Sequence, residues 1–198
     1  MSENGTTRKR DAAATKEALL AAATELFTTR GFDRTSVRDI AALAEVNQAL
    51  VFRYFGSKEA LLGAVVTAPG RALLAETPPG RLLATLVRET LAQEPGGASG
   101  NLLLLALSGP QDGGAAEVLE REVAEPLRAA LTARTARPDA ELRAELVCAW
   151  LLGLALTRHL RTDGQLAKAD PETASTLVLD VVTTLLGAES ESPTATDR

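Results

Sequence analysis

The stretch GFDRTSVRDIAALAEVNQALVFRYFGSKEALL, residues 31–62, decides the fold of the N-terminal part of the chain. Its first apolar residues recur at the i, i+3, i+4, i+7 spacing that places them on one face of a helix, and they are Val37, Ile40, Ala41 and Ala44. Thr35 or Ser36 can cap that helix, because a hydroxyl oxygen accepts a hydrogen bond from an unpaired backbone N–H of the first turn. The stretch therefore begins with a short amphipathic helix that leaves Arg38 on its other face.

A second short helix follows. The apolar pattern breaks at Glu45-Val46, and Asn47 supplies a new N-cap for a helix that runs from Gln48 to Tyr54. Two short helices joined by three or four residues are typical of a helix-turn-helix, whose second helix enters the major groove of DNA by its N-terminal end. The stretch therefore predicts a DNA-binding protein.

The segment from Thr15 to about Val66 resembles the N-terminal domain of TetR-type transcriptional regulators. That domain has a Gly-Phe pair near the end of a long first helix, an aromatic-rich end to the second short helix, and a Ser-Lys-Glu-Ala-Leu start to the next helix. The matching residues here are Gly31-Phe32, Phe52-Arg53-Tyr54-Phe55 and Ser57-Lys58-Glu59-Ala60-Leu61. Because several features agree in the same order, the resemblance is specific in this segment. The rest of the chain matches only in helical layout.

The resemblance implies DNA contacts for several residues. Gln48 and Ala49 begin the second helix, where the family reads base edges: Gln can bond adenine bidentately, and Ala can contact a thymine methyl. For these two, simple solvation of a helix start is the alternative. Arg38 matches a position that reaches a base, although a surface ion pair with Asp39 or Glu45 explains it as well. The expected DNA-binding residues are Thr35, Ser36, Arg38, Asn47, Gln48, Ala49, Arg53, Tyr54 and Lys58.

Two of these residues match the family's phosphate-binding positions, and the chain departs from the family pattern at two further positions. Tyr54 and Lys58 match phosphate-binding positions, and Lys58 gains from the positive N-terminal end of its helix. Glu45 stands where the family commonly has Gly in the turn, and a left-handed Glu45 would cost about 1–2 kcal/mol. Phe52 stands where the family often has a phosphate-binding Tyr. Without a hydroxyl it is expected to pack rather than to bind, with Arg53 able to replace the contact.

Composition indicates an all-α protein. The chain has 198 residues, of which 45% are hydrophobic and 3% aromatic, so it can bury a sizeable core and is rich in the helix formers Ala and Leu. No stretch alternates as a half-buried strand would. The net charge of −5 is uneven: residues 1–60 hold 9 Lys and Arg against 8 Asp and Glu, and residues 61–198 hold 12 against 18. The acidic excess therefore lies outside the DNA-binding stretch, which supports the DNA-binding prediction weakly.

The expected organisation has four parts and about nine helices. Residues 1–14 form a disordered tail, 15–56 a helix-turn-helix DNA-binding domain, 57–187 a helical effector-binding and dimerisation domain, and 188–198 a second disordered tail. Arg8-Lys9-Arg10 in the first tail either adds phosphate contacts or stays solvated. Pro69-Gly70 predicts a kink or break in the helix that begins at Ser57.

The last two predicted helices, about 139–161 and 172–186, have more apolar residues than one buried face of a helix can hold. The middle of the first is apolar nearly all round, so it must be covered on more than one side. Five or six such side chains left exposed would forfeit about 1.5–3 kcal/mol each. In the family these helices pair with the partner's copies in a four-helix interface, and a homodimer is expected here, with a pair of core helices in a monomer as the alternative. The expected interface residues are Leu146, Trp150, Gly153, Leu177, Val181 and Leu185.

A homodimer fits the expected DNA partner and the family's regulation. Two copies can occupy successive major grooves, about 34–36 Å apart, and read a palindromic operator in double-stranded DNA. By resemblance, the helices from about residue 57 to residue 161 hold a cavity for a small hydrophobic effector, whose binding changes the spacing of the two reading heads. The candidate residues that line this cavity are Leu104, Trp150 and Leu154, with His159 as a further one. For Trp150 and His159, simple packing or a solvated helix end is the alternative explanation. The family's usual sign is repression.

Other classes of protein are less well supported. The chain has one His and one Cys, and it shows no catalytic pair, cofactor loop or metal-ligand spacing, so no enzyme activity, cofactor or metal is expected. A helical ligand-binding or protein-interaction module that does not read DNA remains the alternative.

The first thirty residues lack a secretory signal, the longest apolar run, Leu146–Leu156, is too short to span a bilayer, and Cys148 has no partner for an intrachain disulfide. A cytoplasmic protein without a membrane partner is therefore expected.

Overall fold

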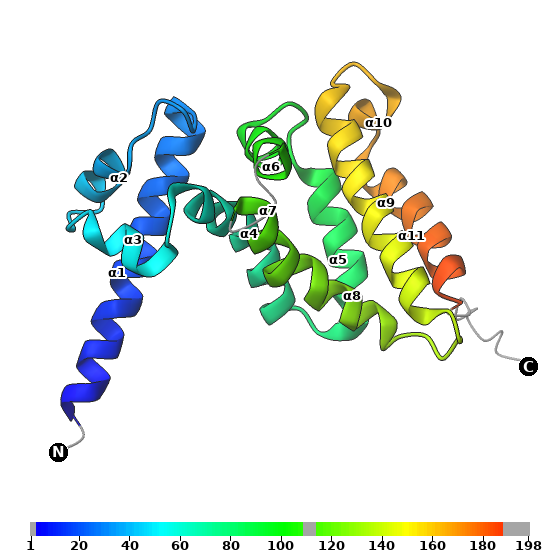
Figure 1. Ribbon diagram of the computed structural model, residues 1–198. Coiled ribbons are helices and arrows are strands. Elements are labelled where there is room, and N and C mark those ends of the chain that lie inside the picture. The colour runs from blue at the N-terminus through cyan, green and yellow to red at the C-terminus, as the bar shows by residue number, and fades with distance from the viewer. Residues whose placement is uncertain (1–2, 109–113, 188–198) are drawn as a thin grey trace, which may run out of the picture. The chain divides into compact units, whose positions relative to one another are not determined.

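The computed structural model describes residues 3–108 and 114–187, and Figure 1 shows helices joined by short connections. No strand occurs within these two ranges, which confirms the all-α prediction. None of the helices described is long and apolar enough to cross a membrane. The elements in chain order are α1 (Glu3–Arg30), α2 (Val37–Leu43), α3 (Ala49–Phe55), α4 (Lys58–Glu76), α5 (Pro79–Ala92), α6 (Ala98–Ser108), α7 (Ala115–Leu119), the π-helix η1 (Glu120–Ala124), α8 (Glu125–Thr132), α9 (Ala140–Leu160), α10 (Gln165–Lys168) and α11 (Pro171–Leu186).

The described chain forms two compact units that divide it differently from the expected boundary at residue 56. The first unit runs up to Pro69 and includes Ala98–Glu122, and the second contains Gly70–Gly97 and the residues from Val123 onward. The reason is the size of α2 and α3, which have seven residues each. Helices that short depend on packing for their stability, and here they share a core with Leu61, Leu62 and Val65 of α4 and with Leu102 and Ala106 of α6.

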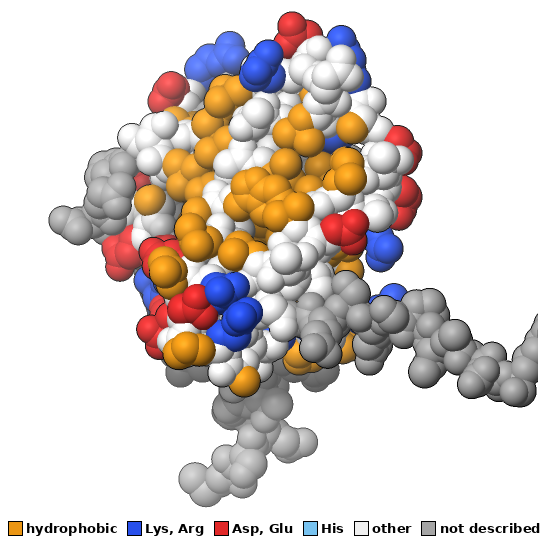
Figure 2. Space-filling model, turned by 90° about the vertical axis from the view of Figure 1, so that its right-hand side faces the viewer, with side chains coloured by type: hydrophobic (Ala, Val, Ile, Leu, Met, Phe, Trp, Pro, Cys, Tyr) orange, Lys and Arg blue, Asp and Glu red, His pale blue; other side chains and the backbone are white. Residues whose placement is uncertain are grey.

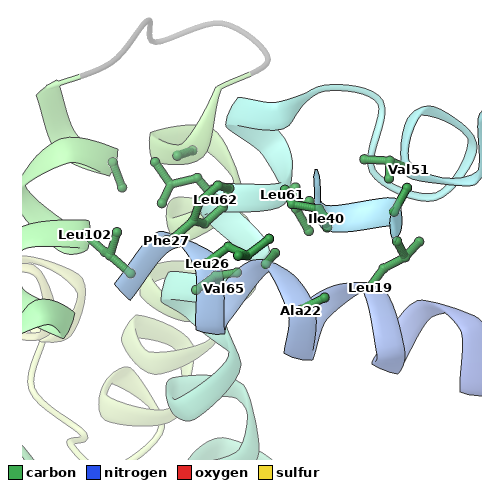
Figure 3. Packing of buried hydrophobic residues seen from close by; sticks show 14 residues of the cluster. Leu19, Ala22, Leu26, Phe27, Ile40, Val51, Leu61, Leu62, Val65 and Leu102 are labelled. Carbon is green, nitrogen blue, oxygen red and sulfur yellow. The ribbon is translucent and has the colours of Figure 1, made fainter. Parts of the chain in front are cut away.

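The core of the first unit is shown in Figure 3. Side chains from α1, α2, α3, α4 and α6 point toward one another, and the labelled ones are Leu19, Ala22, Leu26, Phe27, Ile40, Val51, Leu61, Leu62, Val65 and Leu102. Leu19, Ile40, Val51 and Leu61 are completely buried. Each short helix therefore has one face fixed in the core, and this fixes which residues its other face presents to solvent.

The N-terminal boundary also differs from the expectation. α1 begins at Glu3, so residues 3–14 are helical where a disordered tail was expected. The run Ala12–Ala14 consists of the best helix former, and no proline interrupts the sequence before the buried Leu19. Because each further residue adds a hydrogen bond to a helix that already exists, the packed part of α1 extends toward the N-terminus. The second expected tail, residues 188–198, lies outside the described residues.

Pro69 does not end α4, which continues to Glu76 without the break that the sequence allowed for. A proline inside a helix costs about 3 kcal/mol or more, because it removes a hydrogen bond and crowds the preceding turn. Packing on both sides of Pro69 offsets that cost: Leu61, Leu62 and Val65 belong to the first core, and Leu73 and Leu74 pack against the second. The proline coincides with the point where the chain passes from one unit to the other.

The second unit is built around α5, α8, α9 and α11. Figure 1 shows α9 in yellow and α11 in orange side by side, and α11 also contacts α5 while α8 contacts α9. Val87, Leu131, Val147 and Val182 are buried at 1% exposure or less in its core. The two long C-terminal helices therefore each bury one face inside their own unit.

Arg158 is the one buried arginine of the described chain, with 7% of its surface exposed. Its two terminal nitrogens donate hydrogen bonds to the carbonyl oxygens of Gln93, at 3.2 Å, and Leu166, at 3.3 Å. Gln93 is the C-cap of α5, so the guanidinium sits where the negative end of that helix dipole favours a cation. Arg158 thus joins α9 to the end of α5 and to α10, a short helix that the sequence did not predict.

Candidate nucleic-acid interface

α2 begins with a capping box between Ser36 and Asp39. Ser36 Oγ accepts a hydrogen bond from the Asp39 backbone N–H at 3.1 Å, and the Asp39 carboxylate accepts from the Ser36 backbone N–H at 2.9 Å. The same carboxylate accepts from the Ser36 hydroxyl at 2.6 Å. The hydrogen bond from that hydroxyl is the main cause that holds the pKa of Asp39 below its ordinary value, followed by the backbone bond. The box satisfies two backbone donors and fixes where α2 starts.

Thr35 is buried, which corrects its place among the DNA-binding residues. Only 1% of its surface is exposed. Its hydroxyl lies 2.9 Å from the carbonyl oxygen of Gly31 and 3.3 Å from that of Leu26, so it ties the end of α1 to the start of α2. In the sequence, Thr35 and Ser36 were equivalent hydroxyl residues ahead of a helix. Only the packing shows that Ser36 is the exposed cap of α2 and that Thr35 is buried, with its hydroxyl bonded to backbone carbonyl groups.

The turn between α2 and α3 passes through a left-handed Glu45. Its φ of 56° is the only positive φ of a non-glycine residue in the described ranges. The backbone N–H groups of Glu45 and Val46 donate to the carbonyl oxygens of Ala42, at 3.2 Å, and Ala41, at 3.0 Å, which closes the end of α2. Glu45 therefore takes the conformation for which a glycine is better suited, at the cost of about 1–2 kcal/mol anticipated from the sequence.

α3 starts at Ala49, one residue later than the sequence indicated, and Gln48 rather than Asn47 is its N-cap. The side-chain oxygen of Asn47 accepts a hydrogen bond from the Ala49 backbone N–H at 2.8 Å, so Asn47 still fixes the start of α3 from one residue before the N-cap. Gln48 follows it, is exposed, and makes no side-chain capping hydrogen bond. The amide of Gln48 therefore remains available to bond a partner outside the unit.

α3 presents one buried face and one exposed face. Val51 is completely buried in the first core. Gln48, Ala49, Phe52 and Arg53 are all exposed, and their spacing along the helix places them on one side. The structure thus brings three of the expected DNA-binding residues onto a single outward surface, which we call the α3 face and define by these four residues.

Phe52 is 53% exposed and does not belong to the first core, which differs from the expectation that it packs. Val51 fills the inward position of α3, and its neighbour Phe52, about 100° further around the helix, is turned away from the core. The spacing of three and four residues from Ala49 and Gln48 was the signal in the sequence that could have placed it. Sequence reasoning therefore missed Phe52 as a member of the exposed face.

Arg38 is exposed on α2. The ion pair with Asp39 or Glu45 that offered an alternative explanation for it is not found among the described residues. Asp39 is instead bound to Ser36, and Arg38 acts on it only as one of the weaker charges that lower its pKa. The guanidinium of Arg38 therefore remains available to a partner.

The two expected phosphate-binding residues have contacts inside the unit. Tyr54 is partly buried and packs against the first core. Lys58 Nζ donates a hydrogen bond to the Phe32 carbonyl oxygen at 2.6 Å and lies 3.9 Å from the centroid of the Phe32 ring. This structural role of Lys58 was not expected from the sequence. Since an ammonium group has three N–H donors, two remain for a phosphate.

The candidate effector residues do not line the groove found in the second unit. That groove has a volume of about 540 Å³ and is lined by Leu74, Ala75, Glu76, Thr77, Pro78, Pro79, Leu82, Pro126 and Ala130. Leu154, Trp150 and His159 lie on α9 and do not belong to this set, and Leu104 lies on α6 in the other unit. Periodicity could not find the groove, because three different helices and a loop contribute to it.

The expected dimer residues lie on an apolar surface of α9 and α11. Figure 2 shows apolar side chains gathered on the side of the molecule where these two helices lie. Four of the six residues are exposed large apolar side chains, Leu146, Trp150, Leu177 and Val181. Gly153 is exposed with open space where a side chain would stand, and Leu185 is partly buried. Leu142 and Leu160, exposed by 58% and 65%, extend the α9 part of this apolar surface.

Two family models match the chain. Residues 19–65 match the model described as bacterial regulatory proteins of the tetR family. Residues 81–186 match the model described as a tetracyclin repressor-like C-terminal domain. The first match contains α2, α3 and the α3 face, and the second covers more than half of the chain by itself.

Individual relatives agree with these models. An HTH-type transcriptional repressor of Mycobacterium tuberculosis is 59% identical over 49 residues, which cover 25% of this chain and 26% of the repressor. The chain therefore matches about a quarter of the length of its curated relatives. A TetR-family regulator from Streptomyces coelicolor A3 has a crystal structure with a TM-score of 0.56 and 29% identity, over 88% of this chain and 96% of that one.

A further solved structure supports the fold alone. NalD of Pseudomonas aeruginosa, described as the secondary repressor of the MexAB-OprM multidrug efflux pump, has a TM-score of 0.59 at 22% identity, over 91% of this chain and 100% of that one. The helix-turn-helix geometry, the matches in both parts of the chain and the solved relatives lead to one conclusion. The chain belongs to the TetR family of bacterial transcriptional regulators.

Proposed function

We propose that the protein is a homodimeric repressor that binds a palindromic operator in double-stranded DNA and releases it when a small hydrophobic effector binds. The observation that carries the DNA part is the α3 face: Gln48, Ala49 and Arg53 stand together on the exposed side of a helix whose other side is fixed by Val51. A helix held in this way can enter a major groove without rearrangement of its core.

Each exposed residue has a contact that its chemistry favours. Gln48 bonds an adenine edge, Ala49 lies against a thymine methyl, and Arg38 bonds a guanine. Ser36 at the start of α2, Asn47 before α3 and Arg53 on the α3 face contact phosphates, as Tyr54 and Lys58 do from the far end of α3 and the start of α4. Thr35 is not part of this proposal, because it is buried.

The homodimer follows from the apolar surface of α9 and α11. Leu146, Trp150, Leu177 and Val181 are large apolar side chains left exposed on two neighbouring helices. Covering each of them would contribute about 1.5–3 kcal/mol, and a second copy offers the same surface to cover it. Gly153 has open space above it, which lets a partner's side chain or backbone approach α9 closely. This partner is a second copy because a palindromic operator offers two identical half-sites, which two copies related by a two-fold axis can read.

The effector site proposed here is the groove between α4, α5 and α8. Its volume of about 540 Å³ suits a small organic molecule. Leucine, alanine and proline side chains dominate its lining, and Glu76 is its one charged residue. An apolar effector matches that lining. Binding there would release DNA only if the effector prefers the conformation that holds the two reading heads at the wrong spacing.

The test is selection of bound duplexes from a random library with the full-length protein, followed by gel shifts. Gln48→Ala removes the proposed adenine contact, and Gln165→Ala, an exposed glutamine of α10, is the matched control. We expect wild type and Gln165→Ala to select the same inverted repeat and Gln48→Ala to lose preference at one position of each half-site. Equal binding of all sequences by all three proteins would instead favour a ligand-binding or protein-interaction module that does not read DNA.

A further inference from the structure

We propose that Phe52 determines sequence specificity by an apolar contact with the 5-methyl group of a thymine in the major groove. The proposal rests on the proposed function, because it needs the α3 face to lie against base edges. It adds a further base preference to those proposed above for Gln48, Ala49 and Arg38.

The position of Phe52 is the first argument. The ring is 53% exposed although the same helix buries Val51 completely, so the side chain is directed away from the core. It stands four residues after Gln48 and three after Ala49, which is one helical turn along the same side. Phe52 is therefore continuous with the residues that begin the DNA-reading helix.

The chemistry of the ring decides which DNA group it can contact. A phenyl group has no hydrogen-bond donor or acceptor, so contact with a phosphate oxygen or a polar base edge would only remove water from that group. In the major groove the thymine methyl is the one apolar group that a base pair presents, and Phe is among the side chains that contact it. A thymine is thus the base that an exposed Phe at this position favours.

The geometry of the helix limits where that thymine lies. Four residues of an α-helix advance by about 6 Å, and base pairs of one strand are spaced by about 3.4 Å. The thymine should lie within about two base pairs of the base that Gln48 reads. The operator half-site thus combines a position read by hydrogen bonds with a nearby position read by an apolar contact.

The experiment removes single methyl groups from the DNA. The operator is first selected from a random duplex library with the full-length wild-type protein, and each thymidine of a half-site is then replaced in turn by deoxyuridine, which keeps pairing and lacks the methyl. We expect one replacement within two base pairs of the Gln48-dependent position to weaken wild-type binding by about fourfold per half-site. Phe52→Ala should bind both duplexes equally at that position.

Two further variants separate this contact from general effects of losing an apolar side chain. Phe52→Leu keeps an apolar group and should keep part of the methyl dependence even if Phe52→Ala binds too weakly to measure. Leu43→Ala removes another exposed apolar side chain of the same unit, on α2 and outside the α3 face. This control should respond to deoxyuridine as wild type does.

Three outcomes would overturn the proposal. A wild type that selects an operator but responds to no deoxyuridine near the Gln48-dependent position leaves the regulator intact and refutes the methyl contact. A full wild-type response in both Phe52→Ala and Phe52→Leu assigns the methyl contact to another residue. Failure of wild type to select any sequence refutes the proposed function itself, and the role of Phe52 with it.

Discussion

Glu45 shows how a single residue holds the helix-turn-helix in shape. Its left-handed backbone, with a φ of 56°, lets the chain reverse between α2 and α3 and leaves the Asn47 side chain in place to accept a hydrogen bond from Ala49, the first residue of α3. An L-residue in this conformation is strained, because its Cβ is crowded by the backbone. The strain is maintained by the packing of Ile40 and Val51 on either side of the turn.

Replacing Glu45 with glycine should therefore stabilise the protein. Glycine relieves about 1–2 kcal/mol of strain and loses about 0.5–1 kcal/mol through its greater freedom in the unfolded chain, so we expect a net gain of roughly 0.5–1 kcal/mol. Urea unfolding gives the free energy of unfolding directly. Glu25→Gly in α1, an exposed glutamate in a regular helix of the same unit, should lower stability by about 0.5–1 kcal/mol. If both variants lose stability, position 45 is not strained.

At the scale of the element, the capping box at the start of α2 links helix stability to pH. Asp39 is tied to Ser36 by three hydrogen bonds. Its pKa is lowered because two of them, from the Ser36 hydroxyl and backbone N–H, are accepted by the carboxylate and favour its charged form. A carboxyl group with a lowered folded-state pKa contributes stability above its unfolded pKa, here the ordinary 3.8, and loses it as the pH falls through the folded-state value. The box therefore holds α2 at neutral pH and weakens only in acid.

Removing this box should give a pH-dependent loss. We expect Ser36→Ala to cost about 1 kcal/mol at neutral pH, because a backbone donor of α2 loses its acceptor. Asp39→Asn should be less stable than wild type at neutral pH, and the difference should shrink as the pH falls below 3.8, where wild-type Asp39 becomes protonated. Thermal unfolding followed by circular dichroism at several pH values measures both effects. A difference between Asp39→Asn and wild type that stays constant down to pH 2 would contradict the linkage.

A second element-scale prediction concerns Arg158, which joins α9 to the end of α5 and to α10. Arg158→Ala leaves the carbonyl oxygens of Gln93 and Leu166 without their donor and opens a cavity, so we expect a loss of about 2–5 kcal/mol in the free energy of unfolding. Arg121→Ala, an exposed arginine whose ion pairs lie at the surface, should change stability by about 1 kcal/mol or less. Chemical denaturation of the two variants checks the contrast, and equal losses would show that burial of Arg158 is unimportant.

At the scale of the whole molecule, the apolar surface of α9 and α11 should decide the oligomeric state. Leu177 is 64% exposed in the single chain, so a charged residue there does not disturb the core and acts only on an interface. Trp150, the one tryptophan of the chain, lies on the same surface and reports on its exposure. Association is therefore visible both by mass and by the tryptophan emission.

We expect Leu177→Glu to be a folded monomer at micromolar concentration, while wild type sediments as a dimer. The free energy needed to bury an unpaired carboxylate at each of two symmetric positions exceeds the stabilisation that the apolar interface provides. Tryptophan emission should shift to longer wavelength in the variant. Leu105→Glu changes an exposed leucine of α6 instead and should leave the dimer intact. A wild-type monomer at this concentration would refute the interface.

The helix-turn-helix could be predicted because its signals are local. The spacing of Val37, Ile40 and Ala41, the cap at Ser36 and the turn at Glu45 act over a few residues, and all of them appear in the structure. Asn47 bonds the first residue of α3, whose N-cap is the next residue, Gln48. The apolar stripe of α9 and α11 was readable for the same reason, since helical periodicity alone groups Leu146 with Trp150 and Leu177 with Val181. Local hydrogen bonds and periodicity are properties of the sequence itself.

Tertiary packing decided what the pattern left open. Thr35 and Ser36 are neighbouring hydroxyl residues, and Val51 and Phe52 are neighbouring apolar ones. In each pair the first residue is buried and the second is exposed to solvent. The division of the chain at Pro69 and the groove beside Pro126 likewise depend on residues far apart in sequence. The sequence by itself determined the helices, their caps and their apolar faces, because these result from interactions within a few residues. Only the tertiary structure decided how far each helix is rotated about its axis and which helices share a core, because that depends on how side chains from distant segments fill a common volume.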